Sequence, residues 1–282
     1  MGDAVEPSFA SPAVLEFYRT LPFNFAGDID HQIRAVRGHD MTKTFPALAS
    51  AAAAAGSVID VGCGVGWLAL SMAHQFGAQV TGIDFNPVAI ARAREAARKL
   101  GLSCRFDVAD LFVYQPDFPV GLAVSMGVLH HTENCAAAVG VLCRRYIDVG
   151  GKVFVGLYHS HGRKPFLDHF RRLRDAGRSE EQLLADYVRL DRRFTDRTQQ
   201  VSWFRDQVLH PHETQHTLAE MVDVLTANGM ELDATSINGY RPFERLSDLF
   251  EAEKGLEDIG RAALSQGNYH PGFFSFIAHR VR

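Results

Sequence analysis

The sequence is poor in the features that mark secreted, membrane-spanning and nucleic-acid-binding proteins. It has four cysteines in 282 residues, and no two of them form a CxxC pair. Scattered cysteines in apolar contexts favour a reducing compartment over a disulfide framework. No segment approaches the roughly 20 apolar residues that cross a bilayer, and the N-terminus has early acidic residues in place of an apolar signal sequence. We therefore expect a cytoplasmic protein with no membrane partner.

The chain also lacks a strong charge of either sign. It has 29 basic and 33 acidic residues and a formal net charge of -4, so no large positive field gathers phosphate backbones. This balance disfavours nucleic acid as a partner. Hydrophobic residues make up 46% of the chain, which is enough for a sizeable core without a metal or disulfide. We expect a monomer or a homodimer.

Short apolar runs alternate with helical patterns from Ser57 onward. The runs are VIDVG, QVTGID, CRFDVAD, VGLAVSMG and KVFVGLYH, with LDATSI and FFSFIAHR further along the chain. Asn86 and Pro87 suit the N-cap and first residue of a helix, and Gly77 and Gly101 suit helix ends. Repeated strand–helix alternation predicts an α/β fold whose mostly parallel sheet is covered on both faces.

Interruptions of this alternation divide the chain into four parts. Residues 1–56 form an N-terminal helical lid segment, whose last helix we expect to stop at Gly56. Residues 57–159 form the predicted core, and residues 160–216 form a polar, Arg-rich helical insertion. Residues 217–282 complete the core, starting at a Thr217–Glu220 capping box. This last part contains a second, irregular insertion at about 238–272.

The clearest motif is VIDVGCGVGWLAL. A hydrophobic strand leads through Asp60 to Gly62, Gly64 and Gly66, and then into a helix. Glycines let the backbone turn tightly and approach a ligand, and the amides at a helix start favour an anionic group. A dinucleotide fingerprint would need its third glycine at Trp67, where an indole obstructs close helix–strand packing. The spacing is instead G-x-G-x-G, with an acid two residues before the first glycine.

This spacing resembles motif I of the class I S-adenosylmethionine (SAM)-dependent methyltransferases. The resemblance implies a Rossmann-like, doubly wound, seven-stranded sheet with an antiparallel last strand, and SAM as cofactor with S-adenosylhomocysteine (SAH) as product. It places Asp60 at the methionine amino end, Asp84 at the ribose hydroxyls and Asp110 at the adenine amino group. The expected cofactor-binding residues follow four strands: Asp60, Gly62, Cys63, Gly64, Gly66, Asp84, Phe85, Asp110, Leu111, Met126, Gly127 and His130.

The acceptor side follows from the chemistry of methyl transfer. The reaction is an in-line displacement at a sulfonium methyl, so the protein mainly aligns the acceptor and excludes water. An oxygen or nitrogen acceptor that carries a proton also needs a base, often His. We expect His131, Tyr158 and His159 to be catalytic, although a single His is more often structural. The expected acceptor-binding residues are Tyr18, Phe23, Phe25, His161, Arg163, His210 and His212.

Several stretches together resemble a subgroup of bacterial type-11 methyltransferases. They are FYRTLPFNF, VLHHT, GLYHSHGR and DQVLHPHETQHT. The chain departs from the subgroup's pattern at His159, where Asn is usual, and at His161, where Tyr is usual. These departures fall on the presumed acceptor wall, so the resemblance supports a methyltransferase more than any particular acceptor.

Four donors near residue 213 also have the types that bind zinc. They are His210, His212, Glu213 and His216. Because Thr217 caps the following helix, we do not expect His212 and His216 to share a helical face. We predict a hydrogen-bonded loop and no metal.

The sequence thus predicts a SAM-dependent methyltransferase that acts on a small-molecule acceptor. Secondary metabolism is one pathway class in which such an enzyme could act. A tRNA or protein methyltransferase is the alternative, and it would need a continuous basic face. The Arg-rich run from Arg171 to Arg178 suits a solvated helix face better, because no base-stacking aromatics are interleaved with it. An NAD(P)-dependent oxidoreductase is disfavoured by Trp67, and a SAM-binding protein without catalysis stays open.

Overall fold

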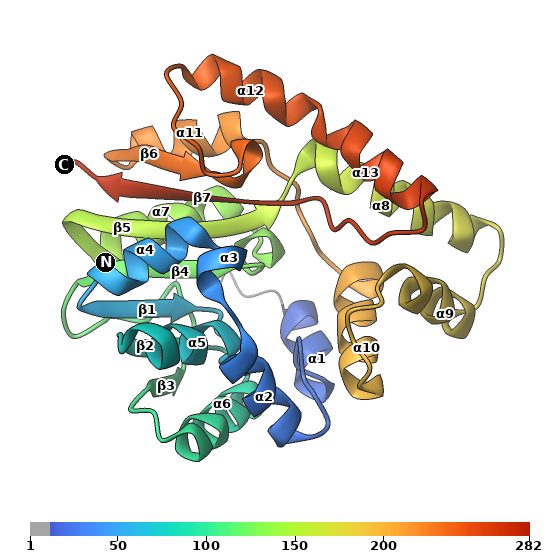
Figure 1. The fold of residues 1–282 in the computed structure, drawn as a ribbon, viewed down its shortest axis with the longest axis horizontal. Helices are drawn as coiled ribbons and strands as arrows, with labels where there is room; N and C mark the ends of the chain where they lie inside the picture. The colour runs from blue at the N-terminus through green and yellow to red at the C-terminus, as the bar shows by residue number, and fades with distance from the viewer. Residues whose placement is uncertain (1–11) are drawn as a thin grey trace, which may run out of the picture.

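The computed structural model describes residues 12–282, and every structural statement below concerns that part of the chain. One seven-stranded sheet runs through the molecule in the order β3-β2-β1-β4-β5-β7-β6 (Figure 1). β7 is antiparallel to β5 and β6, and the other neighbouring pairs are parallel. The strands are β1 (Ser57–Val61), β2 (Gln79–Asp84), β3 (Arg105–Val108), β4 (Val120–Met126), β5 (Ile147–Tyr158), β6 (Met230–Thr235) and β7 (Phe273–Arg280). The predicted Rossmann-like sheet with an antiparallel last strand is confirmed.

Helices cover both faces of the sheet. One face carries α2 (Ile29–Gly38), α3 (Met41–Thr44), α4 (Pro46–Ala54), α5 (Trp67–Phe76) and α6 (Pro87–Leu100). The other carries α7 (Cys135–Val141), the π-helical turn η2 (Leu142–Tyr146) and α11 (Leu218–Ala227). Buried apolar side chains fill both layers, with Leu70 and Ile90 on the first face and Val139 and Leu225 on the second. Because helices cover both faces, a ligand can approach the sheet only at the ends of its strands.

Local sequence sets the ends of these helices as predicted. The side chain of Asn86 caps α6 by accepting the N–H of Val88 at 2.9 Å, and Pro87 follows as the first helical residue. Gly77 and Gly101 end α5 and α6 in the left-handed region, with φ of 65° and 68°. Glycine adopts this region without the steric cost that a Cβ imposes.

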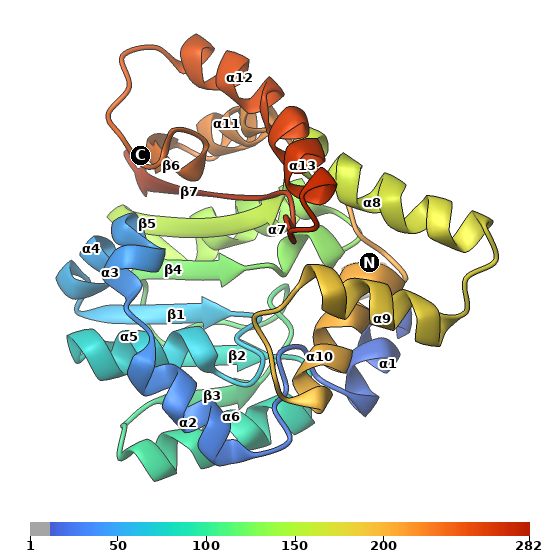
Figure 2. The same ribbon diagram turned by 45° about the vertical axis from the view of Figure 1, so that its right-hand side comes forward.

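The first insertion is helical, as predicted, and has a small core of its own. It comprises α8 (Ser160–Asp175), α9 (Glu180–Leu190), α10 (Arg197–Phe204) and the π-helical turn η3 (Arg205–Leu209). Phe166, Phe170, Tyr187 and Phe204 pack together inside it. The N-terminal helix α1 (Pro12–Thr20) lies beside α10 in both views (Figures 1 and 2). These two pieces of the chain therefore meet at the carboxyl edge of the sheet.

Two predicted strands end earlier than expected. β3 stops at Val108, and Asp110 lies beyond it in a turn, where its Oδ1 accepts the N–H of Phe112 at 2.8 Å. β6 stops at Thr235, whose hydroxyl accepts the N–H of Ile237 at 3.3 Å and starts the 3-10 turn η4 (Ser236–Asn238). Both corrections have one cause, because short Asp and Thr side chains bond the backbone two residues on and turn the chain.

The structure differs from three further expectations. The stretch 238–272 is not irregular, since it holds α12 (Leu246–Lys254) and α13 (Leu256–Ser265). α13 packs on α8 through Gly260, whose Cβ position would lie 3.0 Å from Pro165. α4 ends at Ala54, before Gly56. Thr217 caps α11, but the side chain of Glu220 bonds the Nδ1 of His216 at 3.0 Å and does not complete the predicted capping box.

No described helix has the length and apolar content needed to cross a membrane.

Candidate functional site

The loop between β1 and α5 lies at the carboxyl edge of the sheet, where open α/β sheets bind ligands. Its three glycines have positive φ, with 73° at Gly62, 53° at Gly64 and 82° at Gly66. A Cβ on Gly62 would lie 2.5 Å from the side chain of Val128. A Cβ on Gly66 would lie 2.9 Å from that of Ala93. A Cβ on Gly64 would meet no atom within 4 Å, so Gly64 borders open space while the other two glycines permit close packing.

Two carboxylates lie beside this loop. Asp60 is 2% exposed, and its Oδ2 has no hydrogen-bond partner among the described residues. Burial raises the pKa of Asp60 to about 7. Asp84 ends β2 and accepts the N–H of Gly64 at 2.9 Å and that of Asn86 at 2.8 Å; burial raises the pKa of Asp84 as well. The loop is therefore lined by hydrogen-bond acceptors from two adjacent strands.

The end of β4, which neighbours β1, adds a second open position. Gly127 follows Met126 with a φ of 75°, and a Cβ there would meet no atom within 4 Å. Beyond Asp84 on the other side, Asp110 follows β3. The predicted cofactor residues are thus brought together along four adjacent strand ends, in the order β3, β2, β1 and β4.

The N-terminal segment is fixed against this edge. The side chain of Asn86 donates to the backbone oxygen of Tyr18 at 2.7 Å. Gln32, which is buried, donates to the backbone oxygen of Val65 in the glycine loop, also at 2.7 Å. These bonds hold Tyr18 next to the end of β2 and hold α2 against the glycine loop.

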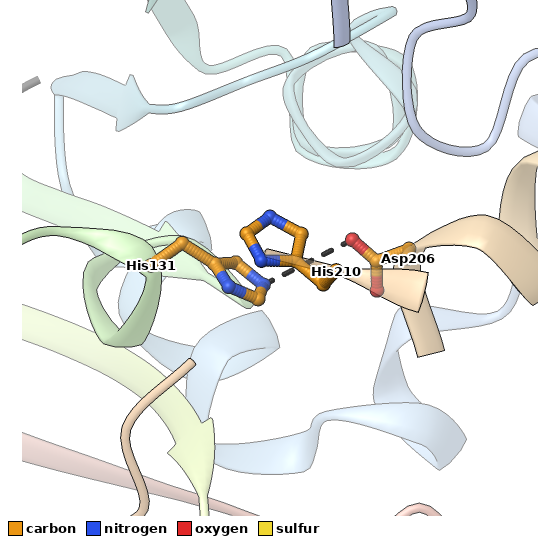
Figure 3. A group of neighbouring side chains, drawn as sticks. All are labelled: His131, Asp206 and His210. Atoms are coloured by element: carbon orange, nitrogen blue, oxygen red, sulfur yellow. Dashed lines mark ion pairs between the residues drawn. The ribbon is translucent and has the colours of Figure 1, made fainter. Parts of the chain in front are cut away.

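Figure 3 shows a cluster of three side chains, His131, Asp206 and His210. Tyr18 contacts all three of them. His131 comes from the 3-10 turn η1 (Leu129–His131) after β4, whereas Asp206 and His210 come from η3 and the residue after it. The imidazole rings of His131 and His210 are stacked, with centroids 3.7 Å apart and planes 28° apart. The Oδ1 of Asp206 lies 3.9 Å from the Nε2 of His131, and these two side chains are 6% and 5% exposed. The core and the insertion therefore contribute jointly to one buried polar cluster.

Asp206 connects the cluster to two tyrosines. Its Oδ1 accepts the hydroxyl of Tyr18, and its Oδ2 accepts the hydroxyl of Tyr158 at 3.3 Å and the Nε2 of Gln207 at 2.7 Å. Burial raises the pKa of Asp206 and keeps that of both tyrosines well above the usual range. Both phenols are therefore donors, and neither is available as a base at neutral pH.

Burial also keeps both stacked histidines neutral. It lowers the pKa of His131 to about 4. It lowers the pKa of His210 to about 3, with repulsion from His131 as the next cause. His131 Nδ1 donates to the backbone oxygen of His212 at 2.9 Å, which leaves its Nε2 unprotonated. This Nε2 has no hydrogen-bond partner among the described residues, so it is a free proton acceptor.

The three residues have the donor types of a two-histidine, one-carboxylate metal site, with ligand atoms within 4.8 Å of one another. Their arrangement does not suit a shared ion. A metal lies in the plane of each imidazole that binds it, and nearly parallel rings 3.7 Å apart cannot both direct a lone pair at one point. The Nδ1 of His210 also accepts the N–H of His212 at 3.1 Å. We derive no metal chemistry from this cluster.

Comparison with known proteins agrees with this geometry. A family model described as a methyltransferase domain matches residues 58–151. An ubiquinone biosynthesis O-methyltransferase of Xylella fastidiosa (strain 9a5c) is 37% identical over 101 residues, which are 35% of this chain and 40% of that protein. Phosphoethanolamine N-methyltransferase 1 of Arabidopsis thaliana is 30% identical over 121 residues, 43% of this chain and 24% of that protein. Magnesium protoporphyrin IX methyltransferase from Synechocystis PCC 6803, crystallised with SAH, has the same fold with a TM-score of 0.53, 16% identity and coverage of 95% and 97%.

The chain contains a class I SAM-dependent methyltransferase domain. Its match to these curated relatives spans less than half of their length. The matched region, residues 58–151, covers β1 to β4 and the start of β5. It therefore contains the glycine loop and His131 of the methyltransferase domain, but neither α1 nor the insertion that supplies Asp206 and His210.

Arg163, predicted to bind the acceptor, has a different role in the structure. It is fully buried and donates to both carboxylate oxygens of Glu213 at 3.0 and 2.8 Å, and to the side-chain and backbone oxygens of Gln207 at 2.9 Å each. Its remaining bond goes to the backbone oxygen of Pro271 at 3.3 Å. Burial by itself lowers the pKa of Arg163, but Tyr158 and Glu213 raise it overall. With all its donors used, Arg163 anchors the insertion and is not an acceptor ligand.

His159, predicted to be catalytic, is also a structural residue. Its Nδ1 accepts the N–H groups of His161 at 3.1 Å and Gly162 at 3.3 Å, and so caps α8. Its Nε2 therefore carries the proton and donates to Glu253 at 2.8 Å. Both ring nitrogens are used and the residue is fully buried, which excludes His159 as a base.

The other predicted acceptor residues divide into two groups. Tyr18 and His210 lie together beside His131, with ring centroids 5.4 Å apart. Phe23 packs on Trp203 and Phe25 on Arg92, so both serve to hold the N-terminal segment. His212 bonds the backbone oxygen of Thr132 at 3.1 Å. The partly buried His161 lies beside His159, and its role as an acceptor ligand stays a prediction.

Sequence reasoning missed Asp206 as a member of the site. Asp206 is recognisable only as part of the DQVLHP stretch, and nothing in that stretch shows that its carboxylate meets His131. The contact joins residues from the core and the insertion, and the Tyr18–Asp206 bond spans 188 positions. Spacing along the chain carries no information about such a contact.

Proposed function

We propose that the protein is a SAM-dependent methyltransferase that acts on a small-molecule acceptor. The proposal rests on one observation, which is that the open backbone positions and an unprotonated histidine nitrogen follow adjacent strands. The open positions at Gly64 and Gly127 lie at adjacent strand ends, and the unprotonated Nε2 of His131 follows directly after β4. A cofactor held at the first two positions is next to a base that can serve its acceptor.

The residues present fit SAM. The unpartnered Oδ2 of Asp60 is available to the methionine amino end. Asp84 uses two of the roughly four lone-pair positions of a carboxylate, which leaves two for the ribose hydroxyls. Asp110, beyond β3, is assigned to the adenine amino group, with Leu111 and Phe85 beside the ring. Bound SAM supplies the electrophilic sulfonium methyl.

The chain's own residues then have three tasks. The N-terminal segment and the helical insertion act as lid pieces that exclude water, and Tyr18 joins them through its bond to Asp206. His131 takes the proton of the acceptor at Nε2 as the acceptor attacks the methyl. The Asp206 carboxylate, 3.9 Å away, stabilises the imidazolium that results.

Charge pairing supports a small acceptor over a nucleic acid or protein. On α8, Arg171 forms an ion pair with Asp168 at 2.9 Å, and Arg172 donates to the backbone oxygen of Asp168 at 3.2 Å. The Arg-rich run therefore carries acids among its bases and does not present a continuous basic face. The names of the relatives include both O- and N-methyltransferases, so they do not favour one acceptor atom.

Ligand-induced stabilisation of the purified protein tests the proposal. SAH should raise the melting temperature in a concentration-dependent way, and NAD⁺ should not. Asp84→Asn should weaken SAH binding by about 30-fold, because it removes a charged hydrogen-bond acceptor. Asp117→Asn, an exposed acid in the loop after β3, is the matched control and should bind as wild type does. Stabilisation by NAD⁺ alone would refute the proposal.

A further inference from the structure

Two acids beside the glycine loop lie on the same face of the sheet. β1 and β2 pair in parallel with Asp60 opposite Gly82, and Asp84 comes two residues further along β2. Side chains alternate between the two faces along a strand. Asp60 and Asp84 therefore both point to the face that α5 and α6 cover, where Val58 and Val80 also pack. The two carboxyl groups are close enough for the charge of Asp84 to act on Asp60.

Neither acid has a basic partner. In the described part of the chain, no Lys, Arg or His side chain forms an ion pair with Asp60 or Asp84. The glycine loop adds Cys63, whose thiol is neutral because burial keeps its pKa well above the usual range. α5 contributes only the backbone N–H of Ala69, β4 has no ionisable residue, and α6 faces the sheet with alanines and Ile90. No element packed around Asp60 therefore supplies a positive charge.

Buried acids elsewhere in the structure do have a base beside them. Asp191 lies 2.7 Å from the guanidinium of Arg193. Glu253 lies 2.8 Å from the imidazole of His159. A buried carboxyl group without such a partner takes up a proton, because an uncompensated charge in the interior is costly. Asp60 meets this condition, since it is 2% exposed and its Oδ2 has no hydrogen-bond partner among the described residues.

Asp84 is better placed than Asp60 to stay ionised. It is partly exposed, and its two oxygens accept the N–H groups of Gly64 at 2.9 Å and Asn86 at 2.8 Å. Hydrogen bonds of this kind favour the charged form of a carboxyl group. The hydroxyl of Tyr18, which also lies near Asp84, is neutral. Burial raises the pKa of Asp60 to about 7, and the charge of Asp84 contributes to this shift.

We propose that the ligand-free protein carries one proton on the Asp60–Asp84 pair, at Asp60, and that a ligand with an ammonium group at the glycine loop displaces this proton to solvent. The inference rests on the proposed methyltransferase function, because the amino end of SAM and of SAH is such a group. The ammonium supplies the positive charge that the surrounding elements lack. Asp60 then becomes a carboxylate that accepts from the ammonium.

This exchange balances in charge and makes binding depend on pH. One proton leaves as one ammonium group arrives, so the net charge of the two acids and their partner is unchanged. As pH rises, Asp60 loses its proton in the ligand-free protein, and binding no longer has to displace it. A group with a pKa of about 7 is about nine-tenths protonated at pH 6 and about one-quarter protonated at pH 7.5. The affinity for SAH should therefore rise about eightfold over this range.

Titration calorimetry of the full chain counts the displaced protons. SAH is titrated in phosphate and in imidazole buffer at the same pH, and the difference in heat gives the number of protons that the buffer takes up. We expect about 0.9 proton for each SAH bound at pH 6 and about 0.25 at pH 7.5. The matched ligand is 5′-methylthioadenosine, which has the nucleoside and thioether of SAH but no amino-acid tail. It should release no proton, and its affinity should not change over this range.

A variant assigns the proton to Asp60. Asp60→Asn keeps the shape of the side chain but has no acidic proton to lose. It should release no proton when SAH binds, and its affinity for SAH should be the same at pH 6 and pH 7.5. Asp117→Asn, at an exposed acid, is the matched control and should release protons as wild type does. The comparison of the two ligands on wild type does not depend on the folding of any variant.

The outcomes separate this inference from the proposed function. Binding of SAH without proton release at pH 6, or equal release with both ligands, would overturn the inference and leave the methyltransferase proposal standing. Undiminished release in Asp60→Asn would also overturn it, because the proton would then come from another group. Failure of SAH to bind would refute the methyltransferase proposal and the inference with it. Release with SAH alone, lost in Asp60→Asn, supports the inference.

Discussion

The two halves of the proposed site, which we call the cofactor half and the acceptor half, are built from different parts of the polypeptide. The cofactor half is mainly backbone, with three glycines of positive φ and two acids on adjacent strands, all between residues 60 and 84. The acceptor half is made of side chains from distant segments, and its bonds span 81 positions between His131 and His212 and 188 between Tyr18 and Asp206. Backbone geometry is set by local sequence, whereas the side-chain cluster exists only when the insertion is docked on the core. The two halves should therefore respond differently to substitution.

The largest expected effect is on the docking of the insertion. Arg163→Met should lower the free energy of unfolding by about 3–5 kcal/mol, because it leaves the carboxylate of Glu213 buried without its partner. Arg171→Met, which breaks an ion pair whose side chains are 63% and 32% exposed, should cost less than about 0.5 kcal/mol. Urea unfolding measures both. Equal costs for the two variants would show that the acceptor half does not depend on this buried pair.

The same contrast explains what the sequence could and could not predict. The sheet, Asp60, Asp84 and the glycine loop follow from local patterns, because strand ends and positive-φ glycines have their own spacing. The roles of His159 and Arg163 do not follow in this way. Both have residue types typical of catalysis, yet their partners Glu253 and Glu213 lie 94 and 50 positions away. Whether a buried polar side chain binds a ligand or anchors the fold depends on such partners.

A smaller effect should appear in the pH dependence of stability. The pKa of His131 is about 6.5 in an unfolded chain and about 4 in the fold, because burial disfavours its charged form. As pH falls below 6.5 the unfolded chain binds a proton that the folded chain does not, so the free energy of unfolding decreases. Between pH 6.5 and 5 this one group should cost about 2 kcal/mol. The contribution is fully retained only above about pH 6.5.

Comparison of His131→Phe with wild type isolates this contribution. The carboxyls of Asp60 and Asp206, whose pKa values are raised by burial, act in the opposite direction but are common to both proteins. The variant should lose less stability between pH 7 and pH 5 than wild type does, as measured by urea unfolding at each pH. His74→Phe, at an exposed position of α5, is the control. If the free energy of unfolding changed with pH equally in His131→Phe and wild type, His131 would be solvated and not buried in the cluster.

The smallest expected change in stability, at Gly64, should be accompanied by weaker binding of SAH. Gly64 and Gly77 both have positive φ, 53° and 65°, and a Cβ at either would meet no atom within 4 Å. Gly64→Ala and Gly77→Ala should therefore destabilise the fold alike, by about 1 kcal/mol. The methyl group of Gly64→Ala enters the proposed cofactor crevice, whereas that of Gly77→Ala lies at the end of α5. Calorimetric titration with SAH should show about tenfold weaker binding for the first variant and unchanged binding for the second. Equal affinities would mean that the open space beside Gly64 is not where the cofactor binds, and that the cofactor half, like the acceptor half, depends on contacts beyond its local sequence.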